Sequence, residues 1–424
     1  MKKISLFLLI LFPMLAMAQS GTNSPYSQFG LGILSDQSTG FNRGMNGVSQ
    51  AWHQSAQVNY QNPASYAFID SLTFLLDVGA SAQVTNFKEG SHKVNANNAN
   101  FEYVVSAFRI MKNVGMSVGI MPFSNIGYNY ASSGSIPSDN TQGYTTTYNG
   151  QGGTRTLYMG IGWQPLKGLA IGANIGYFWG TYSKSVVNTF SNSEASTIAR
   201  YYSADISSYN LDLGMQYDLR LGRKDVVTIG GSYTFGHKTG GSADMSIIES
   251  NTQTTITDTT NFSLDRAIAI PTRISGGLAW RHSTKWHVGI DYSYQKWTQF
   301  HYPDFENNKY IMSSSVLLDR HKFALGGEYV PNATSRRYLN RVHIRAGVGY
   351  ATPYIKVNGK DGPNELSASL GLGLPISVAP GRSIVNISGQ WVRNSADGLI
   401  GENTFRINLG ITFNERWFMK WKLE

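Results

Sequence analysis

Apolar and polar residues alternate along most of this chain, in many separate segments. In residues 405–414, every odd-numbered residue is apolar and every even-numbered residue is Arg, Asn, Gly or Thr. A period of two places successive side chains on opposite faces of a β-strand. The same two-faced pattern occurs in 209–221, 286–295 and 342–350. The sequence therefore predicts an all-β protein whose strands each carry one apolar face.

Fourteen segments after residue 70 carry this pattern, near 72–86, 99–112, 114–130, 144–163, 168–182, 202–221, 225–237, 262–281, 285–300, 314–330, 339–352, 365–378, 383–393 and 403–414. An even number of strands lets a single-chain bacterial barrel place both ends on the periplasmic side. A closed sheet is also the one arrangement that presents such faces to lipid without an unpaired edge. We predict a 14-stranded antiparallel transmembrane β-barrel over residues 71–416.

The connections between the predicted strands alternate in length. Short turns are expected at Lys112-Asn113, Gln164–Lys167, Gly222–Lys224, His282–Thr284 and Ala379–Arg382. Long polar connections are expected around 87–98, 131–143, 183–201, 238–261, 301–313, 353–364 and 394–402. Short periplasmic turns and long external loops are typical of outer-membrane barrels. The two longest connections, 183–201 and 238–261, are predicted to form a mobile polar outer mouth.

The chain begins with the pattern of a secretory signal peptide over residues 1–18. Lys2 and Lys3 precede an apolar stretch from 4 to 15, and Ala16-Met17-Ala18 fits a small-x-small cleavage site. The apolar stretch is too short for a membrane-spanning helix. We expect export, a mature chain that begins at Gln19, and location in the cell outer membrane.

Residues 19–70 differ from the rest of the chain. They are rich in Gly, Ser, Asn and Gln and show no sustained period, yet they contain many aromatic and aliphatic residues. A disordered segment would have less apolar surface to bury. We therefore predict a compact plug, or hatch, inside the barrel lumen. A tail, 417–424, extends past the last predicted strand.

The composition fits a barrel and limits the possible chemistry. The chain has 45 Gly, 24 Tyr, 20 Phe and 9 Trp, and only 14% of its residues are charged, which suits aromatic girdles around a wet lumen. There is no Cys, so disulfides and thiol-based metal sites are excluded. The formal net charge of +9 is scattered, so we expect no nucleic-acid partner and only attraction to anionic lipid head groups.

Motifs of enzymes and metal sites are missing from the sequence. Residues 231–239 resemble a phosphate-binding loop in outline, but His237 interrupts the required Gly-Lys-Ser/Thr order. His282 and His287 are five residues apart, so in one strand they point to opposite faces and cannot share a metal. We predict no enzyme activity, no metal and no cofactor. An outer-membrane hydrolase stays open as an alternative, because Ser and His can meet across strands.

Pro122 lies inside the third predicted strand, followed by Phe123. A proline removes a donor from the hydrogen-bonded ladder and is tolerated mainly at an edge or a bulge. A closed barrel has no free edge, so Pro122 predicts either a kink and gap in the wall or a bend near the rim. Pro375, nearer a strand end, raises the same question.

Several motifs, in this order, resemble the FadL family of outer-membrane channels for long-chain fatty acids and other hydrophobic compounds. They are Asn42-Arg43-Gly44-Met45, Asn62-Pro63-Ala64, Pro122-Phe123, Pro271-Thr272-Arg273, Asp291-Tyr292-Ser293-Tyr294 with Trp297 and Phe300, Arg345-Ala346-Gly347 and Thr352-Pro353. The opening Asn23-Ser24-Pro25-Tyr26-Ser27 and the ending Phe413-Asn414-Glu415-Arg416-Trp417 are similar to the branch found in Bacteroidetes-type bacteria.

The resemblance implies passive uptake of fatty-acid-like molecules. The ligand would enter at the outer mouth, occupy an internal pocket beside the hatch motif Asn62, Pro63 and Ala64, and leave sideways through a gap near Pro122 and Phe123. An apolar cavity near Asn62 is expected for such a channel. It also implies a monomeric barrel in contact with outer-membrane lipids and lipopolysaccharide. The alternative function is a docking or shuttle component for protein secretion, because relatives with a similar barrel have that role.

Overall fold

The computed structural model describes residues 21–136, 139–192, 194–251, 253–254, 256–376 and 383–416. The predicted signal peptide 1–18, the predicted turn Ala379–Arg382 and the tail 417–424 lie outside the described residues.

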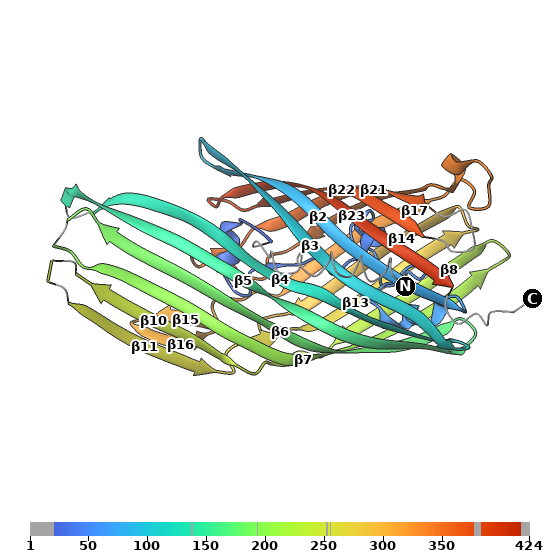
Figure 1. Cartoon of the computed structure of the whole chain (residues 1–424), viewed down its shortest axis with the longest axis horizontal. Helices are drawn as coiled ribbons and strands as arrows, with labels where there is room; N and C mark the ends of the chain where they lie inside the picture. The colour runs from blue at the N-terminus through green and yellow to red at the C-terminus, as the bar shows by residue number, and fades with distance from the viewer. Residues whose placement is uncertain are drawn as a thin grey trace, which may run out of the picture.

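Fourteen antiparallel strands form a closed barrel, as predicted (Figure 1). Each strand pairs with the next in the chain, and β2 pairs with β23 to close the ring. The barrel strands are β2 (Thr73–Glu89), β3 (His92–Met111), β4 (Val114–Ile136), β5 (Asp139–Leu166), β6 (Leu169–Phe190), β7 (Thr197–Leu221), β8 (Asp225–Thr234), β13 (Thr272–His282), β14 (Trp286–Lys296), β17 (Arg320–Tyr329), β18 (His343–Ala351), β21 (Asn364–Pro375), β22 (Ile384–Ser395) and β23 (Gly401–Arg416).

The two faces of the strands differ as the alternation predicts. On β5, Leu157, Met159 and Ile161 point outward and are between 44% and 51% exposed. Their neighbours Thr156 and Tyr158 point into the lumen and are buried. In water such an outer face would be unfavourable, whereas in a bilayer it contacts hydrocarbon. Among the residues that the structure describes, no helix is both long and apolar enough to cross a membrane.

Five of the predicted external loops are wrong, because they are largely strands. One of them, 301–313, is the hairpin of β15 (Tyr302–Glu306) and β16 (Lys309–Ser313). The connections 87–98 and 131–143 continue β2, β3, β4 and β5 as long hairpins, and 183–201 extends β6 and β7. The connection 238–261 contains β9 (His237–Lys238), β10 (Ser242–Ser250) and the first part of β11 (Thr257–Asp265). Much of each hairpin contacts water, although β10 buries Ala243 and Met245 on its inner face, so these sequences carry little apolar alternation. The predicted strand 262–281 correspondingly begins later, at Thr272, as β13.

The long hairpins form a sheet that rises above one side of the barrel. The upper part of β7 pairs with β10, and β10 pairs with β11, so the sheet continues past β7 (Figure 1). The remaining small elements are β12 (Ala269–Ile270), β19 (Lys356–Val357), β20 (Lys360–Asp361) and η3 (Tyr338–Arg341). Pro375 is the last residue of β21 and breaks no ladder.

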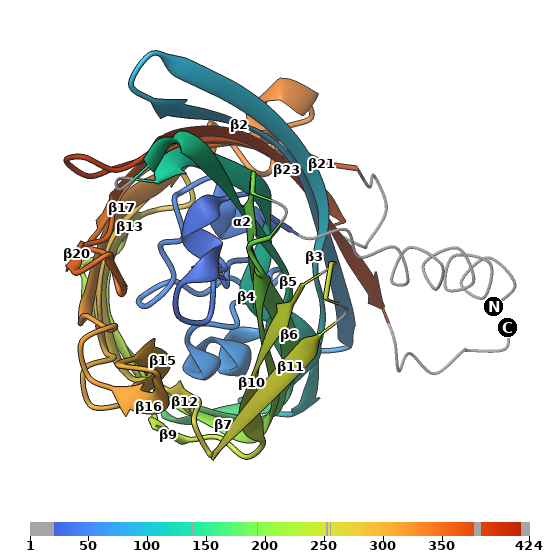
Figure 2. The same cartoon turned by 90° about the vertical axis from the view of Figure 1, so that its left-hand side faces the viewer.

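Residues 21–72 form a lumenal segment inside the ring of strands (Figure 2). Its elements are η1 (Pro25–Gln28), β1 (Ile33–Leu34), α2 (Gly40–Arg43) and η2 (Pro63–Phe68). Ser24 and Asn62 cap η1 and η2, and each of these short helices has a proline in its first turn. A polar cap followed by proline is a favourable helix start. The elements stay short, so the segment is held by the wall rather than by its own secondary structure.

Glycines of the barrel wall make room for the lumenal segment. A Cβ atom at Gly115 would overlap the carbonyl of Tyr66, and one at Gly230 would overlap the carbonyl of Gln50. A Cβ atom at Gly214 would likewise overlap the side-chain oxygen of Asn62. Because glycine lets two backbones approach closely, the segment rests directly on the strands. This contact accounts for part of the high glycine content.

Candidate functional site

Asn62 joins the lumenal segment to the barrel wall. Its side-chain oxygen accepts a hydrogen bond from the backbone N–H of Ala64 at 3.2 Å. Its amide nitrogen donates to the carbonyls of Gln50 at 2.7 Å, Met215 at 3.1 Å and Gly231 at 3.2 Å. The last two acceptors belong to β7 and β8. Asn62 is fully buried, so these bonds are shielded from competing water.

Pro63 and Ala64 continue this contact with the wall. Glycines of three strands face Pro63, namely Gly162 on β5, Gly172 on β6 and Gly214 on β7, and a Cβ at Gly172 would overlap the Pro63 carbonyl. Ala64 is completely buried, with Ala67 and Ala170, in a small apolar cluster. Pro63 and Ala64 are thus packed closely against the wall, and the expected apolar cavity beside Asn62 stays a prediction.

Arg43, from the motif in α2, holds a second polar contact with the wall. Its guanidinium donates to Glu102 of β3 at 3.0 Å and to Asn408 of β23 at 2.9 Å. It also donates to the carbonyl of Ser38 at 3.1 Å within the lumenal segment. Arg43 and Glu102 are 3% and 11% exposed. Sequence reasoning missed Glu102, although an acidic residue between Phe101 and Tyr103 in a strand was a usable signal.

A third contact uses charged groups on β14, β17 and β18. The Asp291 carboxylate accepts from the backbone N–H groups of Ser49 at 2.6 Å and Gln50 at 2.9 Å. On the neighbouring strands, Arg345 donates to Glu328 at 2.7 Å, and Glu328 accepts from the lumenal Gln54 at 2.8 Å. Asp291 and Arg345 belong to the motifs noted in the sequence, and the structure brings both to the wall of the lumenal segment.

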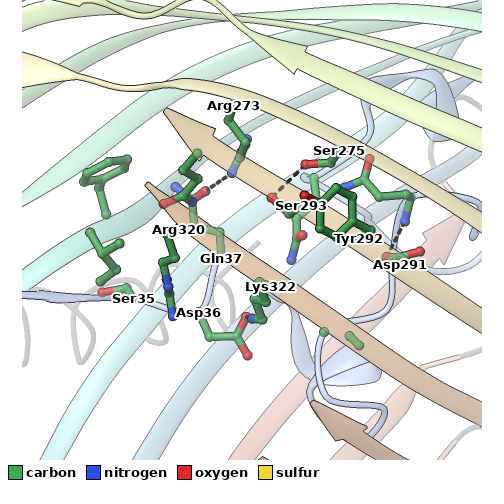
Figure 3. A pocket seen from close by; sticks show the side chains of 17 residues that line it. Ser35, Asp36, Gln37, Arg273, Ser275, Asp291, Tyr292, Ser293, Arg320 and Lys322 are labelled. Atoms are coloured by element: carbon green, nitrogen blue, oxygen red, sulfur yellow. Dashed lines mark hydrogen bonds and ion pairs between the residues drawn. The ribbon is translucent and has the colours of Figure 1, made fainter. Parts of the chain in front are cut away.

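A chamber lies between the lumenal segment and strands β13, β14 and β17 (Figure 3). Its cavity volume is about 70 Å³, and it is partly open to solvent. Its cationic side chains are Arg273, Arg320 and Lys322, and its apolar side chains include Leu34 and Phe123. The chamber is thus amphipathic, with a cationic side and a smaller apolar side.

Asp36 is the lumenal carboxylate of this chamber. Its Oδ1 lies 3.8 Å from the Lys322 ammonium, and Ser38 donates to the same oxygen at 2.6 Å. Burial by itself would raise the pKa of the Asp36 carboxyl, but Lys322 and Arg43 outweigh it and hold that pKa below its usual value. Asp36 therefore stays charged and ties the segment to the cationic wall.

Backbone pairing between β3 and β4 ends at Val104 and Ile120. Above these residues, β3 stays paired with β2 and β4 stays paired with β5. No backbone pair between β3 and β4 is formed there in the described part of either strand. Figure 2 shows the β2–β3 hairpin standing apart from the upper parts of β4 and β5. We call this unpaired boundary, 92–103 of β3 and 121–136 of β4, the β3–β4 seam.

Pro122 and Phe123 lie where the seam begins. Pro122 is opposite Arg155 on β5, while Ser124 is opposite Thr154, so Phe123 is an extra residue and forms a bulge. A bulge bends its strand and increases the local twist. The Phe123 ring packs edge-on against Phe178 at 5.1 Å between ring centroids. The structure thus places both residues at the start of the seam, and an opening of the wall there stays a prediction.

The lumenal segment covers the seam from inside. Ile33 and Leu34 of β1 pair with Asn125 and Ser124 of β4. The Asn100 amide of β3 donates to the carbonyl of Gly21 at 2.9 Å. The segment therefore contacts both edges and supplies hydrogen-bond partners that the two strands do not supply to each other.

A family model described as BamG matches residues 1–424. The chain belongs to the BamG family. No curated protein matches this chain significantly.

Solved structures resemble this BamG-family chain over nearly its whole length. The toluene transporter TbuX of Ralstonia pickettii is 12% identical with a TM-score of 0.59, and the alignment covers 90% of this chain and 99% of TbuX. The toluene transporter TodX of Pseudomonas putida is 14% identical with a TM-score of 0.59, over 92% and 100%. A FadL homologue of Pseudomonas aeruginosa is 12% identical with a TM-score of 0.60, over 91% and 99%.

These similarities concern the fold. They confirm the resemblance to the FadL family as a resemblance of barrels, and the assignment to the Bacteroidetes-type branch stays a prediction. At such low identity they assign no ligand to this BamG-family chain.

One serine–histidine contact bears on the hydrolase alternative. Ser208 Oγ lies 2.7 Å from His237 Nε2, and His237 Nδ1 lies 3.2 Å from the carbonyl oxygen of Phe235. No carboxylate or amide side chain is bonded to His237 within the described ranges. A catalytic triad needs such a group to orient the histidine. The BamG-family chain shows two of the three groups, and its lack of enzyme activity stays a prediction.

Proposed function

We propose that this protein is an outer-membrane channel for the passive uptake of hydrophobic small molecules, such as long-chain fatty acids, with lateral release through the β3–β4 seam. The observation that carries the proposal is the loss of pairing between β3 and β4 above Val104 and Ile120. The unpaired edges begin where the apolar outer face of β5 ends, so a molecule that passes between them reaches the outer leaflet at head-group level.

The chamber and the seam are neighbours, which supports a continuous path. Leu34, Ser35 and Phe123 line the chamber. The same residues form the contact at the seam, where Leu34 pairs with Ser124 and the Ser35 N–H donates to the Phe123 carbonyl at 2.9 Å. Strand β1 therefore separates the chamber from the seam. Displacement of β1 would connect the two.

The chemistry of the chamber favours an amphiphile with an anionic head. Arg320 is paired with Glu365 at 3.2 Å and Lys322 with Asp36 at 3.8 Å, so a ligand carboxylate would compete with these acidic side chains for the charge-assisted hydrogen bonds. Leu34 and Phe123 offer contact to an alkyl chain. Lateral transfer into the bilayer keeps that chain away from water and avoids its hydration cost. The similarity to toluene transporters supports a small apolar cargo. Among small apolar molecules, the cationic wall favours those with an anionic head, such as fatty acids.

The location in the outer membrane rests on the barrel fold together with the signal-peptide pattern at Lys2 to Ala18. The apolar outer face supports contact with membrane lipids and lipopolysaccharide. A monomeric barrel is part of the same proposal.

A disulfide that fixes β1 to β4 tests lateral release. Leu34 and Ser124 are direct partners across an antiparallel pair, a spacing that a disulfide can bridge. The chain has no Cys, so Leu34→Cys with Ser124→Cys introduces a single crosslink. We expect oxidised cells to lose uptake of radiolabelled oleate and reduced cells to recover it. Uptake that is equal before and after reduction would refute the proposal.

A matched pair controls for the effect of crosslinking itself. Ser133 and Thr145 are partners in the β4–β5 hairpin with hydroxyl oxygens 3.0 Å apart. Replacing both with Cys joins two strands that are already paired. We expect the oxidised control to take up oleate at the rate of the unmodified protein.

Replacing Pro122 tests the bulge more directly. Pro122→Val restores a backbone N–H and a strand-forming residue at the position where the wall opens. We expect slower oleate uptake at unchanged barrel content in the membrane. Unchanged uptake would show that the seam does not depend on the proline.

Docking in protein secretion is the second candidate, and the edge of β11 favours it. β11 pairs with β10, and its other edge carries no strand among the described residues. Such an edge can accept an extended chain from another protein. Deleting 242–265 separates the candidates, because a channel keeps its oleate uptake without this hairpin. A docking component would instead lose export of its client proteins.

A further inference from the structure

Arg155 is a cation on the outer, lipid-facing side of the barrel. Four apolar side chains follow it on the same face of β5, at Leu157, Met159, Ile161 and Trp163, and each is at least 44% exposed. Arg155 is the next outward position and is exposed as well. No hydrogen bond or ion pair of its side chain is present among the residues that the structure describes.

The depth of Arg155 matches the outer head-group region. Trp163 and Arg155 are eight residues apart on β5, which is roughly 26 Å along a strand and about 20 Å across a membrane at a 40° tilt. Outward side chains beyond this level are polar, as shown by Thr181 and Ser183 of β6. On the same strand, Tyr177 and Trp179 stack with ring centroids 5.7 Å apart. Aromatic rings of this kind mark the membrane interface.

A hollow surrounds Arg155 on the outer surface. Its volume is about 770 Å³, and Arg155, Trp179, Asn125 and the carboxylate of Asp205 are among the residues that line it. Two consecutive glycines of β5, Gly152 and Gly153, have φ angles of 132° and 154°. A side chain at either position would overlap neighbouring backbone. The two glycines therefore let β5 pack closely against β4 and β6 beside the hollow.

The register places this hollow at the mouth of the seam. Arg155 is directly opposite Pro122 on one side and Trp179 on the other. Asn125, beyond the bulge at Phe123, pairs with the lumenal strand β1. A molecule that left the seam would thus meet a cation and an indole ring at head-group level.

We propose that Arg155 and Trp179 form a binding site on the outer wall for the anionic head group of an amphiphile, either a fatty-acid carboxylate or a lipid phosphate. The guanidinium supplies paired donors to the anionic oxygens, and the apolar side chains from Leu157 to Trp163 accept the alkyl chain below it. The site deepens the proposed lateral release, since it holds the head of a molecule at the exit while its chain enters the bilayer.

Binding of brominated stearate to the full chain in neutral detergent tests this site, because bromine quenches nearby indole fluorescence. We expect saturable quenching by ionised dibromostearate, and loss of most of that signal in Trp179→Phe. Arg155→Gln should weaken binding roughly tenfold, as expected for a charge-assisted hydrogen bond. The methyl ester of dibromostearate should bind equally to Arg155→Gln and to the unmodified protein, since it lacks the anionic head.

Lys296→Gln is the matched control, because Lys296 is another exposed cation at the outer end of a barrel strand, β14. We expect it to bind dibromostearate like the unmodified protein. Lipid A distinguishes the two sources of the anion. Competition by lipid A that requires Arg155 identifies a phosphate, and lack of competition identifies the carboxylate.

Equal dibromostearate binding by Arg155→Gln and the unmodified protein would overturn the proposal. It would also be overturned if Arg155→Gln weakened binding of the methyl ester as much as binding of ionised dibromostearate. Heat-modifiable migration in gels verifies that each variant is a folded barrel. Binding in detergent needs no transport, so the two proposals can be tested separately. Loss of the binding site would leave lateral release untouched, and a failure of oleate uptake would leave dibromostearate binding untouched.

Discussion

Asn62→Ala is the most direct perturbation of the contact between the lumenal segment and the wall. The substitution removes the cap of η2, worth about 1 kcal/mol. It also removes the amide donor to Gln50, Met215 and Gly231. An NH₂ group has two protons, and each net hydrogen bond contributes about 1 kcal/mol. We expect the opening free energy of this part of the segment to fall by about 3 kcal/mol.

Hydrogen–deuterium exchange measures that opening. In η2, the N–H of Ser65 donates to the carbonyl of Asn62 and the N–H of Ile69 donates to that of Tyr66. These amides exchange when the segment opens locally. A loss of 3 kcal/mol corresponds to exchange faster by about a hundredfold. Peptides from the barrel strands should exchange as in the unmodified protein.

Gln57→Ala is the control for this prediction. Gln57 is another buried amide of the lumenal segment, 4% exposed, and neither of its amide atoms has a hydrogen-bond partner among the described residues. Removing an unpaired buried amide leaves no partner unsatisfied, so we expect exchange within about threefold of the unmodified protein. Equal exchange in the Asn62 and Gln57 variants would refute the reasoning and show that apolar packing alone holds the segment.

Three further predictions concern charge and chemistry. Arg43→Met leaves Glu102 buried without its ion-pair partner, at a cost of about 3–5 kcal/mol. We expect this variant to have a larger conductance in planar bilayers, and adding Glu102→Gln should partly reverse the increase. A conductance like that of the unmodified protein would contradict this prediction. The pKa of Asp36 is lowered in the folded protein, so its stabilisation is complete above about pH 4 and is lost as the pH falls below that value through the lowered pKa. Pepsin should cleave the lumenal segment faster on such acidification, whereas Asp36→Asn should show no such pH dependence. Ser208→Ala should not change the hydrolysis of a long-chain nitrophenyl ester by the purified protein, and a loss of hydrolysis would revive the hydrolase alternative.

The barrel could be predicted because the membrane imposes alternation on every strand that crosses it. All fourteen predicted segments overlap a barrel strand of the structure, as with 72–86 and β2 or 403–414 and β23. The strand ends were predictable only to the edge of the bilayer. Beyond it, hairpins such as that of β10 and β11 contact water over much of their surface, so a sequence of Ser, Thr and Asn reads as a loop.

The functional region was predictable where a single residue breaks a local rule. Pro122 interrupts a hydrogen-bonded ladder, and the structure has its bulge next to that residue. Arg155 could not be selected in this way, because its role depends on which strands lie beside it. The register that puts Arg155 opposite both Pro122 and Trp179 is a property of the assembled sheet. The roles of Asn62, Pro63 and Ala64 in opening stay predictions.

The glycines of the inner wall make the barrel and the lumenal segment a fitted pair. Gly115, Gly214 and Gly230 each face backbone or buried atoms of that segment without a gap. A mutation that adds a side chain at one of these positions can persist only if the segment loses volume opposite it. Such changes must therefore arise as compensating pairs, and a segment transplanted from a distant relative would not seat in this barrel.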